Sequence, residues 1–348
     1  MTPSPDPLLL TRAESEAIER LSERLADTDG HHRRVSSLRR AIEAQETETI
    51  GSLLDGGMAL YGPLYPLLMV KECLTDVYEL YRTQGISDAI RDATLFDIRR
   101  WIDEHADRTS GEVGLSQVYW IARHLSCRIL QLGSLQFEPK AFGHPYRIYR
   151  HRGHSEPLIL AEAGIGCNRE GYLETEEIAF TTALQEDGMI LLAHRVDPIT
   201  GEISSLSGSY RLDDLSLLST RETAVLNIHI PKGADLTAES VCASLSHAHT
   251  VFPQHEVMVC SSWLLDPALA VVLDRGSNIV RFMRLFAKFP VPFSLPQIYE
   301  RVFGYGFGID EVLAFPPQTS LQRRVQEAIK EGVVFRTMGG FILPSAAY

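Results

Sequence analysis

No long hydrophobic run occurs anywhere in the 348 residues of the chain. A helix that crosses a membrane needs about 18 or more consecutive apolar residues, so we do not expect a membrane protein or a membrane partner. The first seven residues, Met1 to Pro7, carry neither a basic segment nor a long apolar core. They therefore predict a disordered tail instead of a secretory signal, and a cytoplasmic location.

Cysteine is scarce, and its spacing shows no pattern. The cysteines are odd in number and form no C-x-x-C pair: Cys73, Cys127, Cys167, Cys242 and Cys260. This argues against both a disulfide framework and a cysteine-based zinc site. His247 and His249 are two residues apart on an expected helix and point in different directions, so with His255 they make a poor metal site. We expect no metal.

Positive charge is also in deficit, because the formal net charge is -12 at pH 7. Binding a phosphate backbone needs a concentrated basic surface, so nucleic acid is not an expected partner. The remaining composition, 45% hydrophobic and 22% charged, is typical of a soluble globular protein. The length predicts two domains, and the composition leaves the oligomeric state open.

The first domain, residues 1–127, is predicted to be a helical bundle. Thr11 is expected to cap a first helix and Ser87 a later one, while Gly30 and Gly56-Gly57 are interpreted as breaks. Apolar residues at intervals of three or four predict one helix from about residue 63 to residue 81, and a last helix follows Ser116. Nothing in this half has catalytic character apart from the helix ends.

The pattern changes at Arg128, where residues typical of strands and turns begin, and the second domain is predicted over 128–348. Residues 128–138 are interpreted as one strand with Ser134, Gln136 and Glu138 on a shared face. A hairpin is expected to turn at residues 197–201, and a final hairpin at Gly339-Gly340. The fold class is therefore α+β, with a helical bundle followed by a mixed α/β domain.

Polar groups that suit catalysis gather in the stretch from residue 227 to residue 286. Residues 224–230 alternate as a half-buried strand with His229 on its polar face, and Pro231 ends it. A helix capped by Thr237 follows, and then a second strand over 257–263. A strand, a helix and a strand in close succession predict neighbouring parallel strands.

The chain resembles a bacterial family of acyltransferases in which a helical N-acyltransferase N-terminal domain precedes a GNAT-like domain. The residues that carry the resemblance span both halves: Asp97, Trp101, Trp120, 135–138, 229–231, 262–267, 277–279 and 319–323. The resemblance implies transfer of an acyl group from acyl-coenzyme A to the amine of a small molecule. It implies coenzyme A as co-substrate.

Such a transfer needs a base for the ammonium, donors for the carbonyl oxygen and a cradle for phosphates. Glu138 and His229 are the candidate bases, since each lies near a strand end. The structural alternative is that His229 is a hydrogen-bonded core histidine and that Glu138 pairs with an arginine. The candidates for binding substrate or acyl group also suit turns and core: Gln136, Ser262, Trp263 and Asn278. Cys260 as a nucleophile is disfavoured, because a lone strand cysteine is usually inert.

The segment from Arg301 to Gly306 matches R-x-x-G-x-G, the pattern with which GNAT enzymes hold a pyrophosphate. Arg301, Gly304 and Gly306 are thus candidates for coenzyme binding, with Arg281 and Arg284 as an alternative source of positive charge at a strand edge. The pattern is short and no clear helix follows Gly306. Two other functions stay open: a non-catalytic GNAT-like module that binds a ligand or protein, and a thioester hydrolase or decarboxylase.

Overall fold

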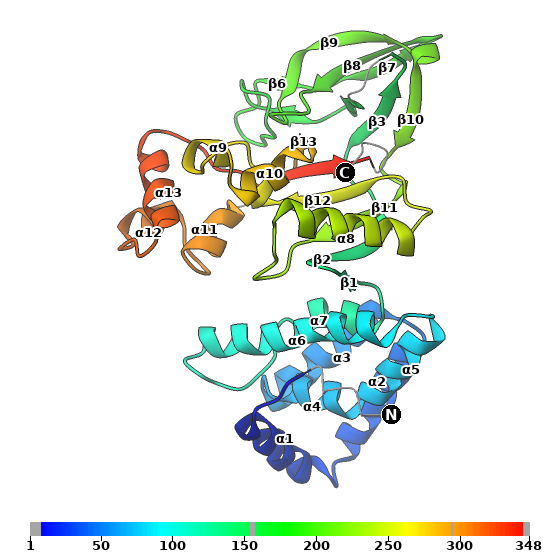
Figure 1. Ribbon diagram of the computed structural model, residues 1–348, viewed down its shortest axis with the longest axis vertical. Helices are drawn as coiled ribbons and strands as arrows, with labels where there is room; N and C mark the ends of the chain where they lie inside the picture. Colours follow the sequence, from blue (N-terminus) through cyan, green and yellow to red (C-terminus); the bar gives the residue numbers. More distant parts are fainter. Residues whose placement is uncertain (1–7, 154–156, 294, 344–348) are drawn as a thin grey trace. The chain divides into compact units, whose positions relative to one another are not determined.

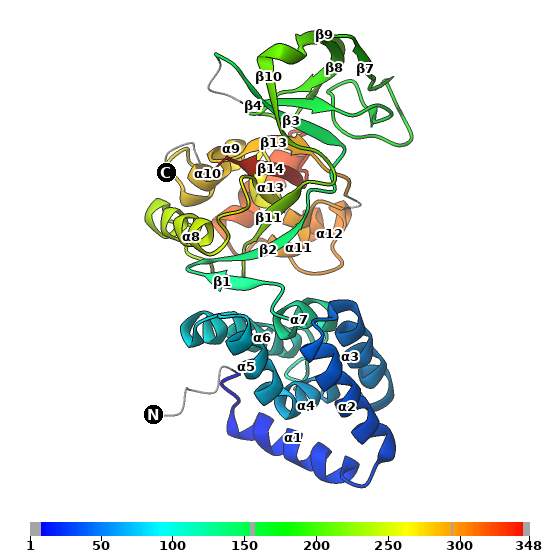
Figure 2. The same cartoon turned by 90° about the vertical axis from the view of Figure 1, so that its right-hand side faces the viewer.

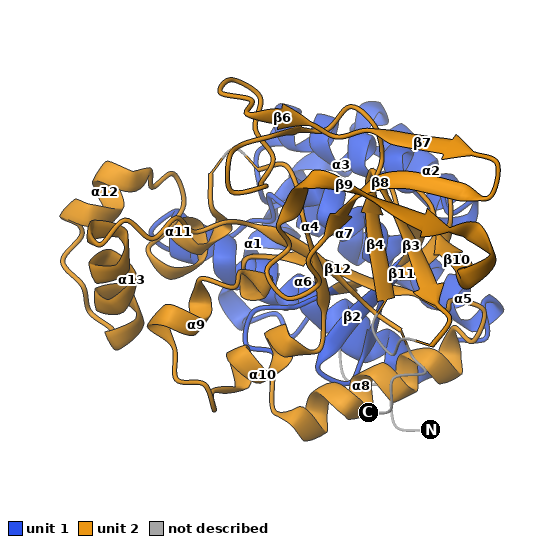
Figure 3. Cartoon of the chain, turned by 90° about the horizontal axis from the view of Figure 1, so that it is seen from above, with its two compact units in different colours: residues 1–138, 229–234 blue, residues 139–228, 235–348 orange. Residues whose placement is uncertain are grey.

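The computed structural model describes residues 8–153, 157–293 and 295–343. The predicted N-terminal tail, Met1 to Pro7, lies outside these residues. The chain divides into two compact units (Figure 3): unit 1 holds residues 1–138 and 229–234, and unit 2 holds residues 139–228 and 235–348. Among the described residues, no helix has both the length and the apolar character that a membrane span requires.

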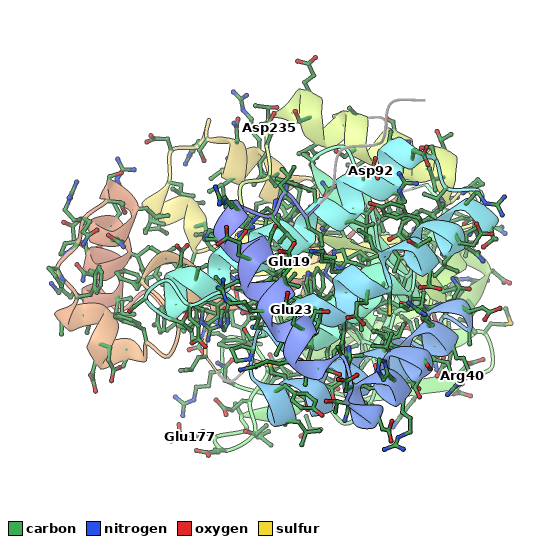
Figure 4. The ribbon with its side chains drawn as sticks, turned by 90° about the horizontal axis from the view of Figure 1, so that it is seen from below. Glu19, Glu23, Arg40, Asp92, Glu177 and Asp235 are labelled. Atoms are coloured by element: carbon green, nitrogen blue, oxygen red, sulfur yellow. The ribbon has the colours of Figure 1, made fainter. Side chains whose placement is uncertain are left out.

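Unit 1 is mostly helical (Figure 1). Its helices are α1 (Arg12–Leu25), α2 (Asp29–Glu43), α3 (Thr47–Tyr61), α4 (Tyr65–Glu72), α5 (Leu74–Thr83), α6 (Asp88–Arg108) and α7 (Val118–Leu125). The predicted caps are confirmed, since Thr11 accepts a hydrogen bond from the Glu14 backbone and Ser87 from that of Ile90. Figure 4 labels Glu19 and Glu23 on the exposed face of α1, whose other face is buried.

Three of the predictions about helix boundaries are wrong. Gly56 and Gly57 lie inside α3, and Gly30 is the second residue of α2. Gly57 is needed for packing, because a Cβ there would lie 2.4 Å from the ring of Tyr65. The single helix expected over 63–81 is two helices, α4 and α5, which meet at Cys73.

The strand predicted over 128–138 is a hairpin. Strand β1 (Leu130–Leu132) pairs antiparallel with β2 (Leu135–Ala141), and Gln131 lies opposite Gln136. Gly133, with φ of +69°, turns the chain between them. Gln136 and Glu138 still share a face of β2, as predicted, but Ser134 belongs to the turn.

The parallel pair predicted around His229 is confirmed. Strand β11 (Ala224–His229) runs parallel to β12 (Met258–Ser262), and α8 (Ala238–Val251) connects them, capped by Thr237. Figure 4 labels Asp235, which accepts hydrogen bonds from Thr237 and Ser240 at the start of α8. The six-stranded sheet has the order β1-β2-β11-β12-β14-β13.

The final hairpin predicted at Gly339-Gly340 is wrong. These residues lie within one strand, β14 (Met338–Ile342), which pairs antiparallel with both β12 and β13 (Ala287–Pro290). A Cβ on Gly339 would lie 2.1 Å from the ring of Phe289. Glycine is therefore needed here because an aromatic ring packs closely against the strand, and not because the chain turns.

A second sheet lies within unit 2 (Figure 2) and packs its apolar face into the core with the strands around β12. Its strands are β3 (Tyr146–His151), β4 (Pro157–Ala161), β7 (Leu184–Asp187), β8 (Ile190–Val196), β9 (Ile203–Arg211) and β10 (Leu215–Ser219), with η1 (Leu212–Asp214) before the last. The predicted hairpin at 197–201 is confirmed, since the Gly201 backbone donates to Asp197 O at 2.8 Å. Strands β5 (Gly166–Cys167) and β6 (Phe180–Thr181) form a small ladder.

Short helices complete unit 2 and enclose a separate apolar core. They are η2 (Trp263–Leu265), α9 (Leu269–Val272), α10 (Asn278–Arg284), α11 (Gln297–Val302), α12 (Ile309–Ala314) and α13 (Ser320–Lys330). The helix predicted over 321–329 is α13, and Gly332 follows its end with φ of +87°, as expected of a helix terminator.

Candidate active site

The two candidate bases form one hydrogen-bonded pair in unit 1. His229 Nε2 lies 3.0 Å from Glu138 Oε2. His229 is the last residue of β11, where Pro231 stops the strand, and Glu138 lies within β2. Their side chains are 22% and 13% exposed, respectively, so both are largely buried yet not sealed from solvent.

Helix α7 supports this pair with two side chains one turn apart. The Trp120 ring meets the His229 ring edge-on at a centroid distance of 4.8 Å. Arg123 Nη1 donates to Glu138 Oε2 at 3.2 Å, and its guanidinium lies 5.3 Å from the Trp120 ring. Because residues three apart share a helix face, one face of α7 contacts both members of the pair.

Asp97, on α6, holds Trp120 in place. Its Oδ2 accepts hydrogen bonds from Trp120 Nε1 at 2.9 Å and from Trp101 Nε1 at 3.1 Å, and its Oδ1 accepts from Arg100 at 3.0 Å. His124 Nε2 also lies 3.2 Å from Oδ2, close enough for an ion pair though not aligned as a hydrogen bond. Asp97 is only 2% exposed.

The charge of Asp97 is strongly stabilised by these partners. Burial by itself would raise the pKa of this carboxyl, but the contacts with His124, Trp120 and Arg100 outweigh it and hold the pKa well below its usual range. A buried carboxylate that keeps its charge orients its donors firmly. Asp97 therefore fixes the indole that contacts His229.

The turn after His229 is tied to α6 by an ion pair. Lys232 Nζ lies 2.9 Å from Glu104 Oε2 and 3.6 Å from Asp107 Oδ2. These contacts all lie within unit 1, which includes the short segment 229–234. The segment that carries His229 is thus anchored on both sides of Pro231.

The pair can perform acid–base chemistry. An ionised Glu138 accepts a hydrogen bond from the protonated Nε2 of His229, and the neutral imidazole then carries its lone pair on Nδ1, where it can take a proton. The carboxylate also stabilises the imidazolium that forms. Sequence reasoning offered Glu138 and His229 as alternatives, whereas the structure places them together.

Gln136 precedes Glu138 by two residues on β2 and is fully buried. Ser262 ends β12, where its Oγ accepts a hydrogen bond from Leu264 N at 3.1 Å and so starts η2. Trp263 packs against the apolar core of the short helices, and its backbone N donates to Gln297 Oε1 at 3.2 Å. Each of these unit 2 contacts is structural.

Asn278, Arg281 and Arg284 lie on a helix, not at a strand edge as predicted. Asn278 is the first residue of α10, and Ser277 caps that helix. The helix forms because Ser277 satisfies its first turn, a signal that also fits a turn in sequence. Arg281 and Arg284 are exposed in its last turn.

The R-x-x-G-x-G segment begins inside a helix. Arg301 lies on α11, with its guanidinium 3.6 Å from Glu300 and 3.4 Å from the Tyr305 hydroxyl. Gly304 and Gly306 have φ of +134° and +80°, respectively, so both require glycine. Helix α12 begins at Ile309, three residues after Gly306, and spans six residues.

Cys260 is buried in β12, and burial raises the pKa of its thiol to about 12. A thiol in this state is a poor nucleophile. All five cysteines are free. The described ranges contain no cluster of histidine, cysteine and acidic side chains that could hold a metal ion.

Sequence reasoning missed the residues that support the pair. Asp97 and Trp120 carried the family resemblance but received no role, and Arg123 and Lys232 were not considered. The members of this network come from α6, α7, β2 and the turn after β11. Their separation along the chain leaves no local pattern that would indicate contact.

Comparison with known proteins identifies both halves of the chain. Residues 6–127 match the N-acyltransferase N-terminal domain, and residues 129–342 match the GNAT-like C-terminal domain. No curated protein matches the chain significantly.

Solved acyltransferase structures are similar to the chain along almost all of its length. One, in complex with decanoyl-CoA and teicoplanin, is 20% identical with a TM-score of 0.59, over 97% of this chain and 85% of that one. A mutant acyltransferase with octanoyl-CoA is 20% identical with a TM-score of 0.57, over 97% and 86%. At such identities the likeness shows a shared fold.

Since the second domain match alone spans more than half of the residues, the chain belongs to the family that joins an N-acyltransferase N-terminal domain to a GNAT-like C-terminal domain.

Proposed function

We propose that the chain is an acyl-coenzyme A dependent N-acyltransferase that acts on a small amine-bearing substrate, with His229 as general base and Glu138 as its partner. The observation that carries this proposal is the 3.0 Å contact between His229 Nε2 and Glu138 Oε2. A histidine titrates near neutrality and so suits the removal of a proton from an ammonium.

In the proposed reaction the amine nitrogen attacks the thioester carbonyl carbon after His229 has taken a proton from the ammonium. The C–N bond forms and the C–S bond breaks. The coenzyme leaves as a thiolate that takes up the second proton lost by the nitrogen, and His229 then releases the first proton to solvent. Glu138 holds the imidazole by its Nε2 proton and offsets the charge of the imidazolium. Arg123 favours an ionised Glu138, and for that reason we assign the role of base to His229.

The relatives support the choice of co-substrate. The acyltransferases of similar fold were crystallised with decanoyl-CoA, octanoyl-CoA or coenzyme A, and some of them also with teicoplanin, a glycopeptide. We propose an acyl-coenzyme A thioester for this chain too. The acceptor of this chain is proposed only as an amine, since its binding residues are not assigned by the comparison.

The coenzyme-binding residues remain proposals. Arg301, Gly304 and Gly306 offer a cation and two backbone positions that require glycine, while Arg281 and Arg284 present exposed cations on α10. Arg301→Ala is expected to weaken coenzyme A binding with little loss of stability, because its ion pair with Glu300 is exposed. Unchanged affinity, measured by calorimetric titration, would remove this segment from the proposal. Ser262, Trp263 and Asn278 are kept as proposed acyl contacts only.

The function is tested by titrating the purified protein with coenzyme A and a panel of acyl-coenzyme A thioesters, then measuring thiol release with and without amines. Amine-dependent thiol release supports the transferase. Release without amine indicates the hydrolase, and binding without release indicates the non-catalytic module. The latter alternative is favoured by one observation: the glycine segment is not followed directly by a long helix.

A further inference from the structure

Two buried glutamines lie on the face of the β1–β2 hairpin that carries Glu138. Gln131 and Gln136 are direct partners across the antiparallel pair, so their side chains project from the same face. Glu138 follows Gln136 by two residues and therefore shares that face. Gln136 is 0% exposed and Gln131 is 6% exposed.

The amide groups of these glutamines are incompletely hydrogen-bonded. Gln131 Nε2 donates to Gly133 O at 2.7 Å. Gln131 Oε1 and both amide atoms of Gln136 have no hydrogen-bond partner among the residues that the structure describes. Buried polar atoms are almost always satisfied in native proteins, so three unsatisfied atoms on one face require an explanation.

Other buried glutamines of the chain are hydrogen-bonded. Gln326 Nε2 donates to Val312 O and Phe315 O, both at 2.7 Å. Gln322 Nε2 donates to Val302 O at 2.8 Å, and its Oε1 accepts from the backbone of Thr319. Buried unsatisfied atoms also occur on Arg34, His105, His124 and His255, but the unsatisfied glutamine amides among the described residues lie on the hairpin beside the candidate base.

We propose that Gln131 and Gln136 bind a secondary amide of a substrate, an inference that rests on the proposed acyltransferase function. The pair offers two carbonyl oxygens that accept and one NH2 group that donates. An amide presents both an N–H and a C=O, whereas a carboxylate would need only donors and an ammonium only acceptors. The pattern therefore selects an amide over either ion.

The position of the pair fits a substrate amide close to the reacting atoms. Two residues along a strand span about 6.6 Å, which separates Gln136 from Glu138. The pantetheine arm of acyl-coenzyme A carries a secondary amide two carbons from its sulfur. An amine acceptor of peptide character carries one at a similar distance from its nitrogen.

The test replaces each glutamine with leucine, which has a similar volume and no polar atoms. Because both amide atoms of Gln136 are unsatisfied, Gln136→Leu is expected to leave the melting temperature unchanged or raised. Gln131→Leu also removes the hydrogen bond to Gly133 O and is expected to lower the melting temperature modestly. Gln326→Leu is the matched control, and it should lower the melting temperature because two carbonyls lose their donor. A loss in the Gln136→Leu variant as large as in the control would overturn the proposal.

Binding then distinguishes the two sources of amide. Coenzyme A and glycylglycinamide, an amine with a secondary amide, are titrated by calorimetry into wild type and both variants. A rise of about tenfold in Kd for coenzyme A alone supports the pantetheine arm, and such a rise for glycylglycinamide alone supports the acceptor. Equal affinities in wild type and variants overturn the amide site.

The same titrations separate this inference from the proposed function. If wild type does not bind coenzyme A, the acyl-coenzyme A function fails, and the amide site stands only if glycylglycinamide binds and the variants weaken it. If wild type binds neither probe, both proposals fail. If wild type binds coenzyme A and the variants bind both probes equally well, only the amide site fails.

Discussion

Trp120 donates its indole hydrogen to Asp97 at 2.9 Å and presents the edge of the same ring system to His229. One side chain thus links a buried carboxylate of α6 to the candidate base. Because Asp97 is buried and is linked to His229 through Trp120, we regard it as a positioning residue.

Removal of either member of the pair should abolish most of the activity. His229→Ala and Glu138→Gln are each expected to lower kcat by about 10²- to 10⁴-fold, because a positioned base contributes that much. Steady-state kinetics with an acyl-coenzyme A and an amine measure the loss, and melting curves check the fold. His247→Ala, which removes an exposed histidine on α8, should leave the rate unchanged. Wild-type rates in both variants of the pair would eliminate the catalytic assignment.

The positioning role of Trp120 can be separated from its role in stability. Trp120→Phe keeps a ring near His229 but removes the hydrogen bond to Asp97, so kcat should fall about tenfold and the acid limb of the rate profile should move. Trp101→Phe removes an equivalent bond to the same carboxylate. It should lower stability without changing the pH profile. Identical pH profiles for the two variants and wild type would show that Trp120 is only structural.

Asp97 should stabilise the protein in a pH-dependent way. Its pKa is lower in the folded chain than the ordinary value of 3.8, so its stabilisation is present above about pH 4 and is lost as the pH falls through the folded value. Asp97→Asn is expected to lower the free energy of unfolding by roughly 2–4 kcal/mol at pH 7. Urea denaturation at pH 7, 5 and 3.5 should show a constant difference that narrows only at the lowest pH. A difference that grows towards acid would contradict this account.

The thiol of Cys260 should be unreactive in the native protein. Because burial raises the pKa of its thiol to about 12, a thiol reagent at pH 8 should label the partly exposed Cys242 and leave Cys260 unmodified. Mass spectrometry of the modified protein measures the two sites separately. Cys260→Ala should retain kcat, and a large loss of rate in a folded variant would revive the nucleophilic mechanism.

The adjacent glycines of α3 should respond oppositely to alanine. Gly57→Ala would place a methyl group 2.4 Å from the Tyr65 ring, which is fully buried, and should cost roughly 1–3 kcal/mol. Gly56→Ala meets only the flexible end of Arg34 at 3.3 Å and should gain about 0.5–1 kcal/mol from helix propensity. Thermal denaturation of the two variants provides the comparison. Equal effects would indicate that the ring of Tyr65 moves aside.

Local signals in the sequence predicted the elements that depend on local contacts. Thr11, Ser87 and Thr237 were recognised as caps because a cap is satisfied by a backbone amide two or three residues away. The parallel strands β11 and β12 followed from the short strand–helix–strand order. His229 and Glu138 were found because each is a titratable residue at a polar strand position.

Contacts between distant residues explain what the sequence did not predict. Gly57 and Gly339 resemble breaks, but each is small because an aromatic ring from elsewhere lies against it. The hairpin at Gly133 resembles a continuous strand, since one glycine is its only local sign. Trp120 and Asp97 are 23 positions apart and are joined through an indole and a carboxylate, a relationship that no periodicity encodes.

The segment 229–234 belongs to unit 1 although the chain on both sides of it belongs to unit 2. The unit that holds the candidate base is therefore discontinuous along the sequence. Proteolysis or expression that ends the chain anywhere between residues 139 and 228 yields the helices and Glu138 without His229. Such a fragment would retain Asp97, Trp120 and Arg123 but would lack the candidate base that Trp120 contacts. Recovery of activity would require the rest of the chain as a second fragment. Mixing the two fragments and measuring activity therefore tests whether residues from both stretches of the sequence are needed.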